Sequence, residues 1–172
     1  MTAQDLLQAG IGRKLCFLGR AADMISISLA STDDCPFEYA IHIETDGALY
    51  YKEGLFTSTA EIDGFAEFGE AIFDKKVKML LTCEEEYVLQ SLTYDQNSCI
   101  HAKFSNGLEV RSLPSPSECD SDLELWRIFF PWKEEPTLIA TQNGITLEPC
   151  HRSQKELDEM HCLWMKRTRN TV

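Results

Sequence analysis

Three Asx-Gly pairs between apolar-rich runs constrain the fold of this chain more than any other feature. They are Asp46-Gly47, Asn106-Gly107 and Asn143-Gly144. Such pairs are the strongest short-range signals for a β-hairpin, because both residues tolerate the positive φ angles of the tight turn. The runs around Asp46-Gly47 alternate at period 2, with Tyr39, Ile41 and Ile43 on one side. The pattern predicts that residues 38–45 and 48–52 form one hairpin and that antiparallel sheet dominates the fold.

Other runs have the composition or the alternation of strands. They are residues 14–19, 24–30, 87–94, 99–104, 108–113, 125–130, 137–141 and 145–147. We expect residues 14–19 to pair with 24–30, and residues 125–130 to pair with 137–141. Residues 54–68 show neither period and are predicted to be irregular. The predicted class is therefore α+β: mainly antiparallel β-sheet, built of hairpins or a meander, with three helices added.

The three helices have different signals. A short N-terminal helix follows the capping residue Thr2, and a central helix runs to about Thr82 with an apolar face formed by Phe73, Val77, Leu80 and Leu81. A C-terminal helix begins after Ser153, which with Glu156 has the spacing of a capping box.

At 172 residues the chain has the length expected of a single domain, residues 1–172. Residues 114–122, rich in Pro, Ser and acids, are predicted to be an exposed loop. No apolar run approaches the ~18 residues that span a bilayer, and the first residues lack the features of a secretory signal peptide. The seven cysteines are an odd number without a paired spacing. These features predict a cytoplasmic protein with reduced thiols and no membrane partner.

Negative charge is concentrated in one stretch of the chain. Residues 33–74 contain eleven acids and one base, Lys52, a sum of −10 in a chain whose net charge is −12. Aromatic residues are mixed with these acids, which is typical of a folded face and not of a solvated tail. Such a surface repels nucleic acid and attracts basic proteins. The basic tail at residues 166–169 is short against a net charge of −12, so no nucleic-acid partner is expected.

Several residues have the types, but not the spacing, of catalytic or metal sites. His42-Ile43-Glu44 matches half of the zinc-deaminase signature, but Pro149-Cys150 is not followed by a second cysteine at Ser153. Cys150-His151 and His161-Cys162 are adjacent pairs, whose side chains diverge. We therefore expect no metal, no cofactor and no catalytic residues. An enzyme with an unrecognised acid-lined site is one alternative, and a structural or adaptor module is another.

Three stretches resemble small bacterial immunity proteins encoded beside polymorphic and contact-dependent growth-inhibition toxin genes. They are residues 19–24 (Gly-Arg-Ala-Ala-Asp-Met), 104–107 (Phe-Ser-Asn-Gly) and 124–127 (Glu-Leu-Trp-Arg) with Pro131. The similarity spans roughly residues 10–147 and leaves the C-terminal helix outside. The resemblance implies a cytoplasmic protein that binds and neutralises the C-terminal domain of a cognate toxin and has no catalytic residues.

The acidic stretch is the expected site of that contact. A toxin domain that degrades nucleic acid has a basic surface, and opposite potentials accelerate association. The predicted partner-binding residues are the acids Glu53, Glu61, Asp63, Glu67 and Glu70, with Phe56, Phe65 and Phe68 as apolar contacts. The alternative for the phenylalanines is that they belong to the core. The identity and activity of the toxin and the oligomeric state do not follow from the sequence.

Overall fold

The computed structural model describes residues 1–31, 37–62, 66–82, 85–114 and 123–169. Within these ranges the chain forms three α-helices, two short 3-10 helices and eleven strands in two antiparallel sheets. The predicted α+β class, dominated by antiparallel sheet, is confirmed.

The first sheet has six strands, in the order β1-β2-β3-β9-β10-β11. Their bounds are β1 Lys14–Ala21, β2 Met24–Ala30, β3 Tyr39–Ile43, β9 Glu124–Phe129, β10 Thr137–Thr141 and β11 Gly144–Glu148. All neighbours are antiparallel, with registers such as Ile27 opposite Ile41 and Ile41 opposite Ile128. The predicted pairings of the first two strands and of residues 125–130 with 137–141 are confirmed.

The second sheet has five strands, in the order β5-β4-β8-β7-β6. Their bounds are β4 Gly47–Tyr51, β5 Gly54–Ser58, β6 Leu89–Tyr94, β7 Ile100–Phe104 and β8 Leu108–Ser112. The Asn106-Gly107 hairpin is confirmed, because β7 pairs with β8 and both turn residues have positive φ, 60° and 78°. The short 3-10 helix η2 (Ser105–Gly107) is this turn.

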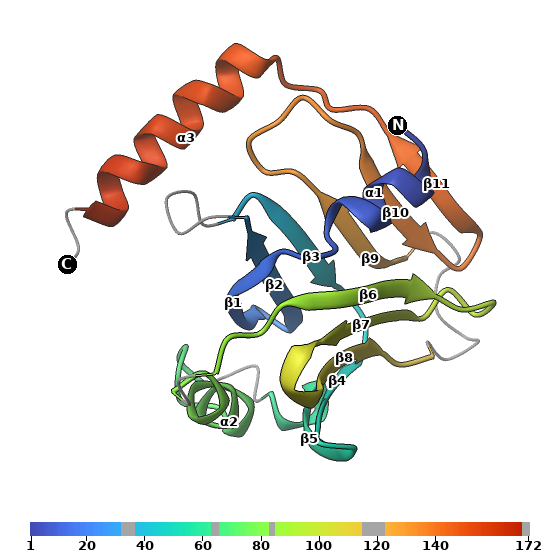
Figure 1. Ribbon diagram of the computed structural model, residues 1–172, viewed down its shortest axis with the longest axis vertical. Coiled ribbons are helices and arrows are strands. Elements are labelled where there is room, and N and C mark those ends of the chain that lie inside the picture. The colour runs from blue at the N-terminus through green and yellow to red at the C-terminus, as the bar shows by residue number, and fades with distance from the viewer. Residues whose placement is uncertain (32–36, 63–65, 83–84, 115–122, 170–172) are drawn as a thin grey trace.

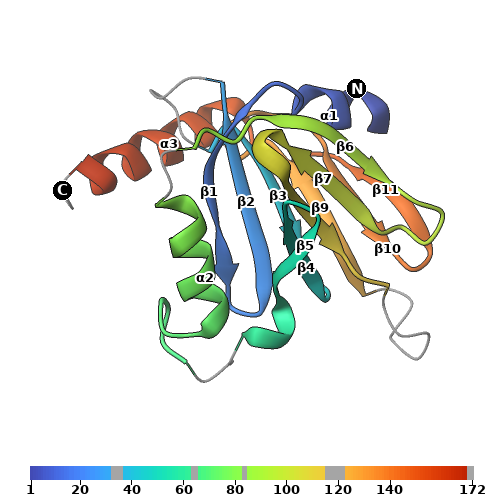
Figure 2. The ribbon, with the colours of Figure 1, turned by 60° about the horizontal axis from the view of Figure 1, so that its bottom comes forward.

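The helices lie outside the sheets. Helix α1 (Ala3–Ala9) has the predicted Thr2 cap, completed by a reciprocal bond with Asp5. Helix α2 (Ile72–Leu81) lies beside β1 at one edge of the first sheet, and the 3-10 helix η1 (Thr59–Glu61) precedes it (Figure 2). Helix α3 (Gln154–Arg169) extends away from the two sheets (Figure 1). Its predicted capping box is present, because Ser153 N donates to Glu156 Oε2 at 2.9 Å and Glu156 N donates to Ser153 Oγ at 3.5 Å.

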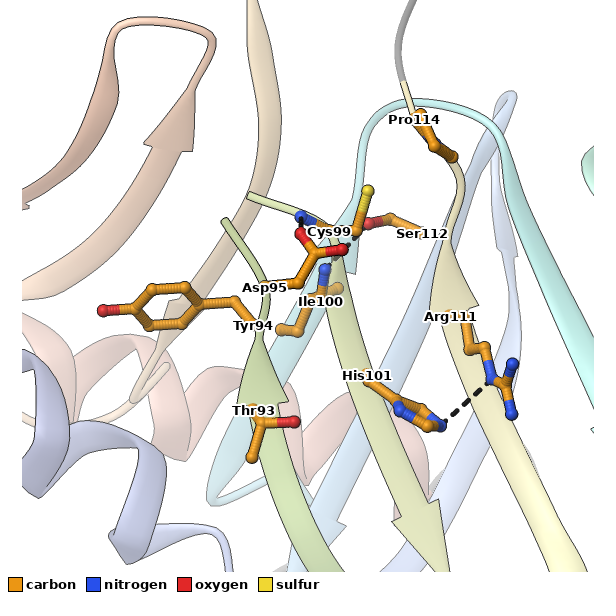
Figure 3. A pocket seen from close by; sticks show the side chains of 9 residues that line it. All are labelled: Thr93, Tyr94, Asp95, Cys99, Ile100, His101, Arg111, Ser112 and Pro114. Atoms are coloured by element: carbon orange, nitrogen blue, oxygen red, sulfur yellow. Dashed lines mark hydrogen bonds between the residues drawn. The ribbon is translucent and has the colours of Figure 1, made fainter. Parts of the chain in front are cut away.

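The outward face of the second sheet is polar. His101 on β7 and Arg111 on β8 lie side by side there, with 3.0 Å between His101 Nε2 and Arg111 Nε (Figure 3). The Arg111 guanidinium also stacks on the ring of Tyr50 in the neighbouring strand, 4.5 Å from its centroid. Side chains alternate across a strand, so the same strands turn their apolar residues inward.

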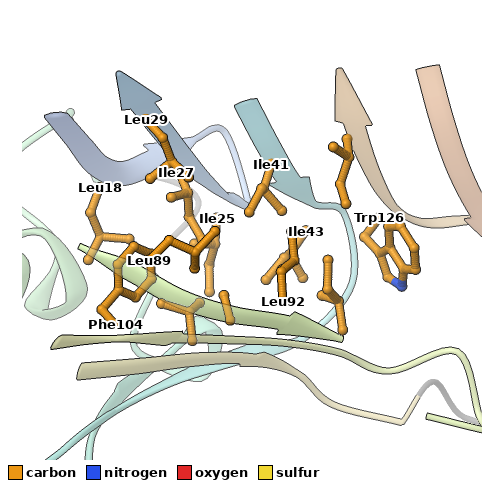
Figure 4. Packing of buried hydrophobic residues seen from close by; sticks show 14 of the residues in the cluster. Leu18, Ile25, Ile27, Leu29, Ile41, Ile43, Leu89, Leu92, Phe104 and Trp126 are labelled. Atoms are coloured by element: carbon orange, nitrogen blue, oxygen red, sulfur yellow. The ribbon is translucent and has the colours of Figure 1, made fainter. Parts of the chain in front are cut away.

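The core lies between the two sheets. Ile25, Ile27, Ile41 and Ile43 of the first sheet face Leu89 and Leu92 of the second, and Trp126 closes one side (Figure 4). Trp126 is fully buried, as expected for a strand tryptophan, and its indole N–H donates to Ser98 O at 2.6 Å. One apolar cluster therefore includes strands of both sheets.

The predicted hairpin at Asp46-Gly47 is wrong. Strand β3 pairs with β2 and β9, whereas β4 pairs with β5 and β8, so the chain passes from one sheet to the other at this point. A Cβ at Gly47 would lie 2.6 Å from Ile25 Cδ1. Glycine is needed here for close packing between the sheets and not for a tight turn.

The prediction that residues 54–68 are irregular is wrong in its first part, because residues 54–58 form β5. The turn before it consists of Lys52 and Glu53, which both have positive φ, 49° and 71°. Such a turn favours Gly, Asn or Asp, so the sequence gives no signal of the hairpin.

Candidate interaction surface

A buried ion pair lies beneath the loop that leads into α2. Arg20 on β1 and Asp74 in the first turn of α2 are both almost fully buried, and Arg20 Nε donates to Asp74 Oδ2 at 3.0 Å and to Oδ1 at 3.1 Å. A buried charge is tolerated when it is paired and its remaining hydrogen-bonding groups are satisfied. Arg20 Nη1 donates to Ala22 O at 3.3 Å, and the other partners of this pair come from the loop itself.

Both charged groups bind the backbone of residues 66–69. Arg20 NH2 donates to Ala66 O at 2.9 Å and to Glu67 O at 3.2 Å, and Asp74 Oδ2 accepts the N–H of Gly69 at 2.9 Å. Gly69 has φ +93°, a conformation that other residues adopt only with strain. The loop is therefore held by three hydrogen bonds from the buried pair and by a glycine suited to its shape.

This loop presents a phenylalanine to solvent between two acids. Phe68 is 72% exposed, and Glu67 and Glu70 beside it are exposed as well. Helix α2, which follows this loop, exposes three further apolar side chains: Ile72, Met79 and Leu81. Isolated apolar residues on a surface are ordinary, but a group of them on one element is typical of an interaction site.

A groove between α2 and β1 continues this apolar surface. It has a volume of 420 Å³, and its lining includes Phe68, Val77 and Leu81 on one side and Cys16 and Phe17 on the other. Lys78 is the one base that lines it among the described residues. The groove adjoins the exposed loop and is of the size that accommodates one or two large apolar side chains.

Most of the described acids of residues 33–74 are paired with bases from other parts of the chain. The pairs are Glu38–Arg13, Glu44–Arg127, Glu61–Lys76, Glu70–Lys75 and Asp74–Arg20. The Lys76 ammonium, 2.8 Å from both Glu61 oxygens, lowers the pKa of that carboxyl, and so does the Thr57 hydroxyl. The folded surface is thus less negative than the sequence window suggests.

The structure separates the predicted contact residues into three groups. Glu67, Phe68 and Glu70 lie together on the loop before α2, and Glu61 is linked to α2 through Lys76. Glu53 is exposed on the β4–β5 turn, whereas Phe56 is half-buried, with its ring edge-to-face to that of Tyr51. Asp63 and Phe65 lie outside the described residues.

A second cavity contains a cysteine and a histidine but not an activated thiol. It has a volume of 290 Å³ and is lined by residues of β6, β7 and β8, including Cys99, His101 and Arg111 (Figure 3). Burial and the nearby Asp95 carboxylate raise the pKa of the Cys99 thiol. A nucleophilic cysteine needs a lowered pKa, so this arrangement does not support the enzyme alternative.

The histidines of the metal-site candidates, His42 and His161, pack against aromatic rings. The ring of His42 packs edge-to-face against Phe129, and burial lowers the pKa of His42. His161 stacks on Trp132, with 4.8 Å between ring centroids. In the described parts of the chain, no three His, Cys, Asp or Glu side chains are grouped closely enough to hold a metal ion.

Arg20 is the residue of this site that the sequence reasoning missed. It lies in the 19–24 motif, and its partner Asp74 is one of the eleven acids of residues 33–74, which the sequence predicts to form a surface. The available signal was the position of Arg20 in a strand whose neighbours are apolar, where a charged side chain requires a buried partner.

Comparisons with protein-family models, with curated proteins and with solved structures find no match. None of the helices in the described ranges has the length and apolar character of a membrane-crossing segment.

Proposed function

We propose that this protein is a cytoplasmic immunity protein, which binds and neutralises the C-terminal domain of a cognate toxin. The observation that supports it best is the loop before α2, where the exposed Phe68 stands between Glu67 and Glu70 on a buried ion pair. The resemblance of the 19–24, 104–107 and 124–127 stretches to immunity proteins points to the same kind of partner.

The physical argument is one of preorganisation. An interface loop that is already ordered loses little conformational entropy when a partner binds. Here three hydrogen bonds from Arg20 and Asp74 fix the backbone beneath Phe68. An exposed aromatic on such a loop can act as an anchor, because hot spots are enriched in well-packed aromatic residues at the centre of an interface.

The charges define the kind of partner. Glu67 and Glu70 flank the anchor, and a toxin domain that degrades nucleic acid presents a basic surface to its substrate. An acidic protein that covers this surface excludes the substrate and associates faster than a neutral one. Lys75 and Lys78 lie on α2 nearby and would repel a basic surface. The acids of the loop, and not the whole helix, would therefore face it.

The test requires the toxin domain of the neighbouring gene. If the gene upstream encodes a large secreted protein with a variable C-terminal domain, that domain is expressed with this protein and without it. We expect the pair to co-purify as a complex and growth to be restored by co-expression. Phe68→Ala should weaken binding by at least about tenfold, the size of effect expected for an interface anchor.

The matched control is Leu147→Ala on β11, which also removes a partly exposed apolar side chain. It should leave the affinity unchanged. Failure of the wild-type protein to bind or to protect would overturn the proposed function. Equal losses of affinity from Phe68→Ala and Leu147→Ala would mean that the protein binds the toxin domain but not through the loop that carries Phe68.

A further inference from the structure

Helix α3 has little contact with the rest of the chain. Of its described side chains, Leu157 alone is buried. His161 and Trp164 lie over the ring of Trp132, with centroid distances of 4.8 and 5.8 Å. Trp164 also packs edge-to-face against Phe37, with 5.1 Å between the ring centroids. These contacts lie along one stripe of the helix, which extends beyond the body (Figure 1).

A second stripe of α3 is apolar and exposed. Leu163 is 59% exposed and Met160 39%, and the two are one helical turn apart. Leu163 is rotated away from the stripe that contacts Trp132, because it follows His161 by two positions. Met160 lies between the two stripes, since it also lines the cavity beside Trp132 and Leu157. These two large apolar side chains lie near the middle of a helix of 16 residues and form an apolar face suited to a partner helix.

The charges of α3 are divided between its two halves. The first half contains the acids Glu156, Asp158 and Glu159 with one base, Lys155. In the second half the sequence has only bases: Lys166, Arg167 and Arg169. Glu159 and Lys166 are both exposed, and neither forms an ion pair within the described residues.

We propose that a second copy of this chain covers the exposed stripe, with its α3 antiparallel to the first. In an antiparallel pair aligned at the helix centres, Met160 lies opposite Leu163 of the partner subunit, and the reverse contact follows by symmetry. Each Glu159 then lies about 3 Å along the axis from the level of the other copy's Lys166, within reach of that side chain.

The charge distribution selects this arrangement. Antiparallel helices place the acidic half of each α3 beside the basic half of the other, and their macrodipoles also oppose one another. A parallel pair would place the two acidic halves at one level and the two basic halves at another, so that like charges would be neighbours. The interface is isologous, so one stripe supplies both sides and the assembly closes as a dimer.

The test is the self-association of the full chain in reducing buffer, measured by sedimentation over roughly 1–200 µM, the range suited to a small interface. We expect a monomer–dimer equilibrium. Leu163→Asp should raise the dissociation constant at least about tenfold, since it places a charge in the apolar centre. Leu147→Asp on β11 is the control and should leave the equilibrium unchanged.

Charge reversal tests the direction of the helices. Glu159→Lys and Lys166→Glu should each raise the dissociation constant at least about threefold, and the double variant should return it to within about twofold of wild type. A protein that stays monomeric throughout this range overturns the proposal. A dimer that ignores Leu163→Asp, or a double variant that shows no recovery, overturns it as well.

Discussion

Arg20 and Asp74 connect β1 to α2 and, through their remaining hydrogen-bonding groups, fix the position of Phe68. The two side chains are 3.0 Å apart in a site that is almost closed to solvent. Three of their other hydrogen bonds go to the backbone of Ala66, Glu67 and Gly69. This buried pair thereby holds the loop backbone that carries the exposed Phe68.

The first prediction is that breaking this pair strongly destabilises the fold. Asp74→Asn keeps the shape of the side chain but leaves the Arg20 charge buried without its counter-ion. We expect a loss of about 3–5 kcal/mol in the free energy of unfolding, measured by urea denaturation. The amide of Gly69, which donates to Asp74, should also exchange its hydrogen faster.

Its control is an exposed ion pair between the loop and the same helix. Glu70 and Lys75 are 3.4 Å apart with side chains about two-thirds exposed. Glu70→Gln should therefore cost less than about 1 kcal/mol. A loss below 1 kcal/mol for Asp74→Asn would contradict the role given to the buried pair.

The second prediction separates an anchor from a core residue. Phe68 is 72% exposed, whereas Phe73, five residues later, is fully buried. Phe68→Ala should change the free energy of unfolding by less than about 0.5 kcal/mol, and Phe73→Ala should reduce it by about 3–5 kcal/mol. Thermal and urea unfolding of both variants checks this. A large loss from Phe68→Ala would place its ring in the core and remove the basis for calling it an anchor.

The third prediction concerns acid stability. Hydrogen bonds from Arg111, and secondarily from His101, lower the pKa of Glu109 to about 2. Because the pKa in the folded state is below the ordinary value, the ionised carboxylate stabilises the fold. This contribution is complete above the ordinary pKa and is lost as the pH falls toward about 2.

Glu109→Gln removes that contribution. Since the Glu109 side chain is a quarter exposed, we expect a loss of only about 1 kcal/mol at neutral pH. The difference from wild type should shrink as the pH is lowered from 5 to about 2, followed by denaturation at each pH. Glu148→Gln, an exposed acid on β11, is the control and should have no such pH-dependent effect. A difference that grows toward low pH would have the opposite sign and contradict the argument.

Local sequence patterns predicted where strands form better than they predicted which strands pair with one another. The alternation of Ile41 and Ile43 and the Asn106-Gly107 turn are properties of neighbouring residues, and the strands and the hairpin they predict are present. The passage between sheets at Gly47 depends on a contact with Ile25, which is distant in the sequence. Strand β5 was missed because its turn, Lys52-Glu53, has positive φ without the usual residues.

The same limit applies to the candidate surface. A count of charges along residues 33–74 treats every acid as exposed, but the fold brings Arg20, Lys76 and Arg127 to acids of this stretch. Phe68 and Phe73 are the same residue type in the same acidic stretch, so the sequence does not distinguish them. The packing of α2 against β1 makes one exposed and the other buried. The sequence identified Glu67, Phe68 and Glu70 as candidates but did not separate them from their buried neighbours.

The last prediction tests whether charge on the loop controls association with the toxin domain. Glu67→Lys combined with Glu70→Lys should slow association at least about tenfold at low salt, because the loop beside Lys75 and Lys78 then carries only positive charges toward a basic partner. The dissociation rate should change less. The difference from wild type should shrink as salt rises, since ions screen exposed charges beyond about 10 Å at 0.1 M. Stopped-flow or surface-based kinetics at several salt concentrations measure this.

The matched control carries the same change in net charge at a different place. Glu135→Lys combined with Glu148→Lys alters two acids that line the cavity beside Trp132, on the first sheet. If the loop is the contact, this variant should associate at close to the wild-type rate. Equal slowing by both variants would mean that the net charge of the whole protein governs association. Slowing by the control alone would move the contact to the β10–β11 side and away from Phe68.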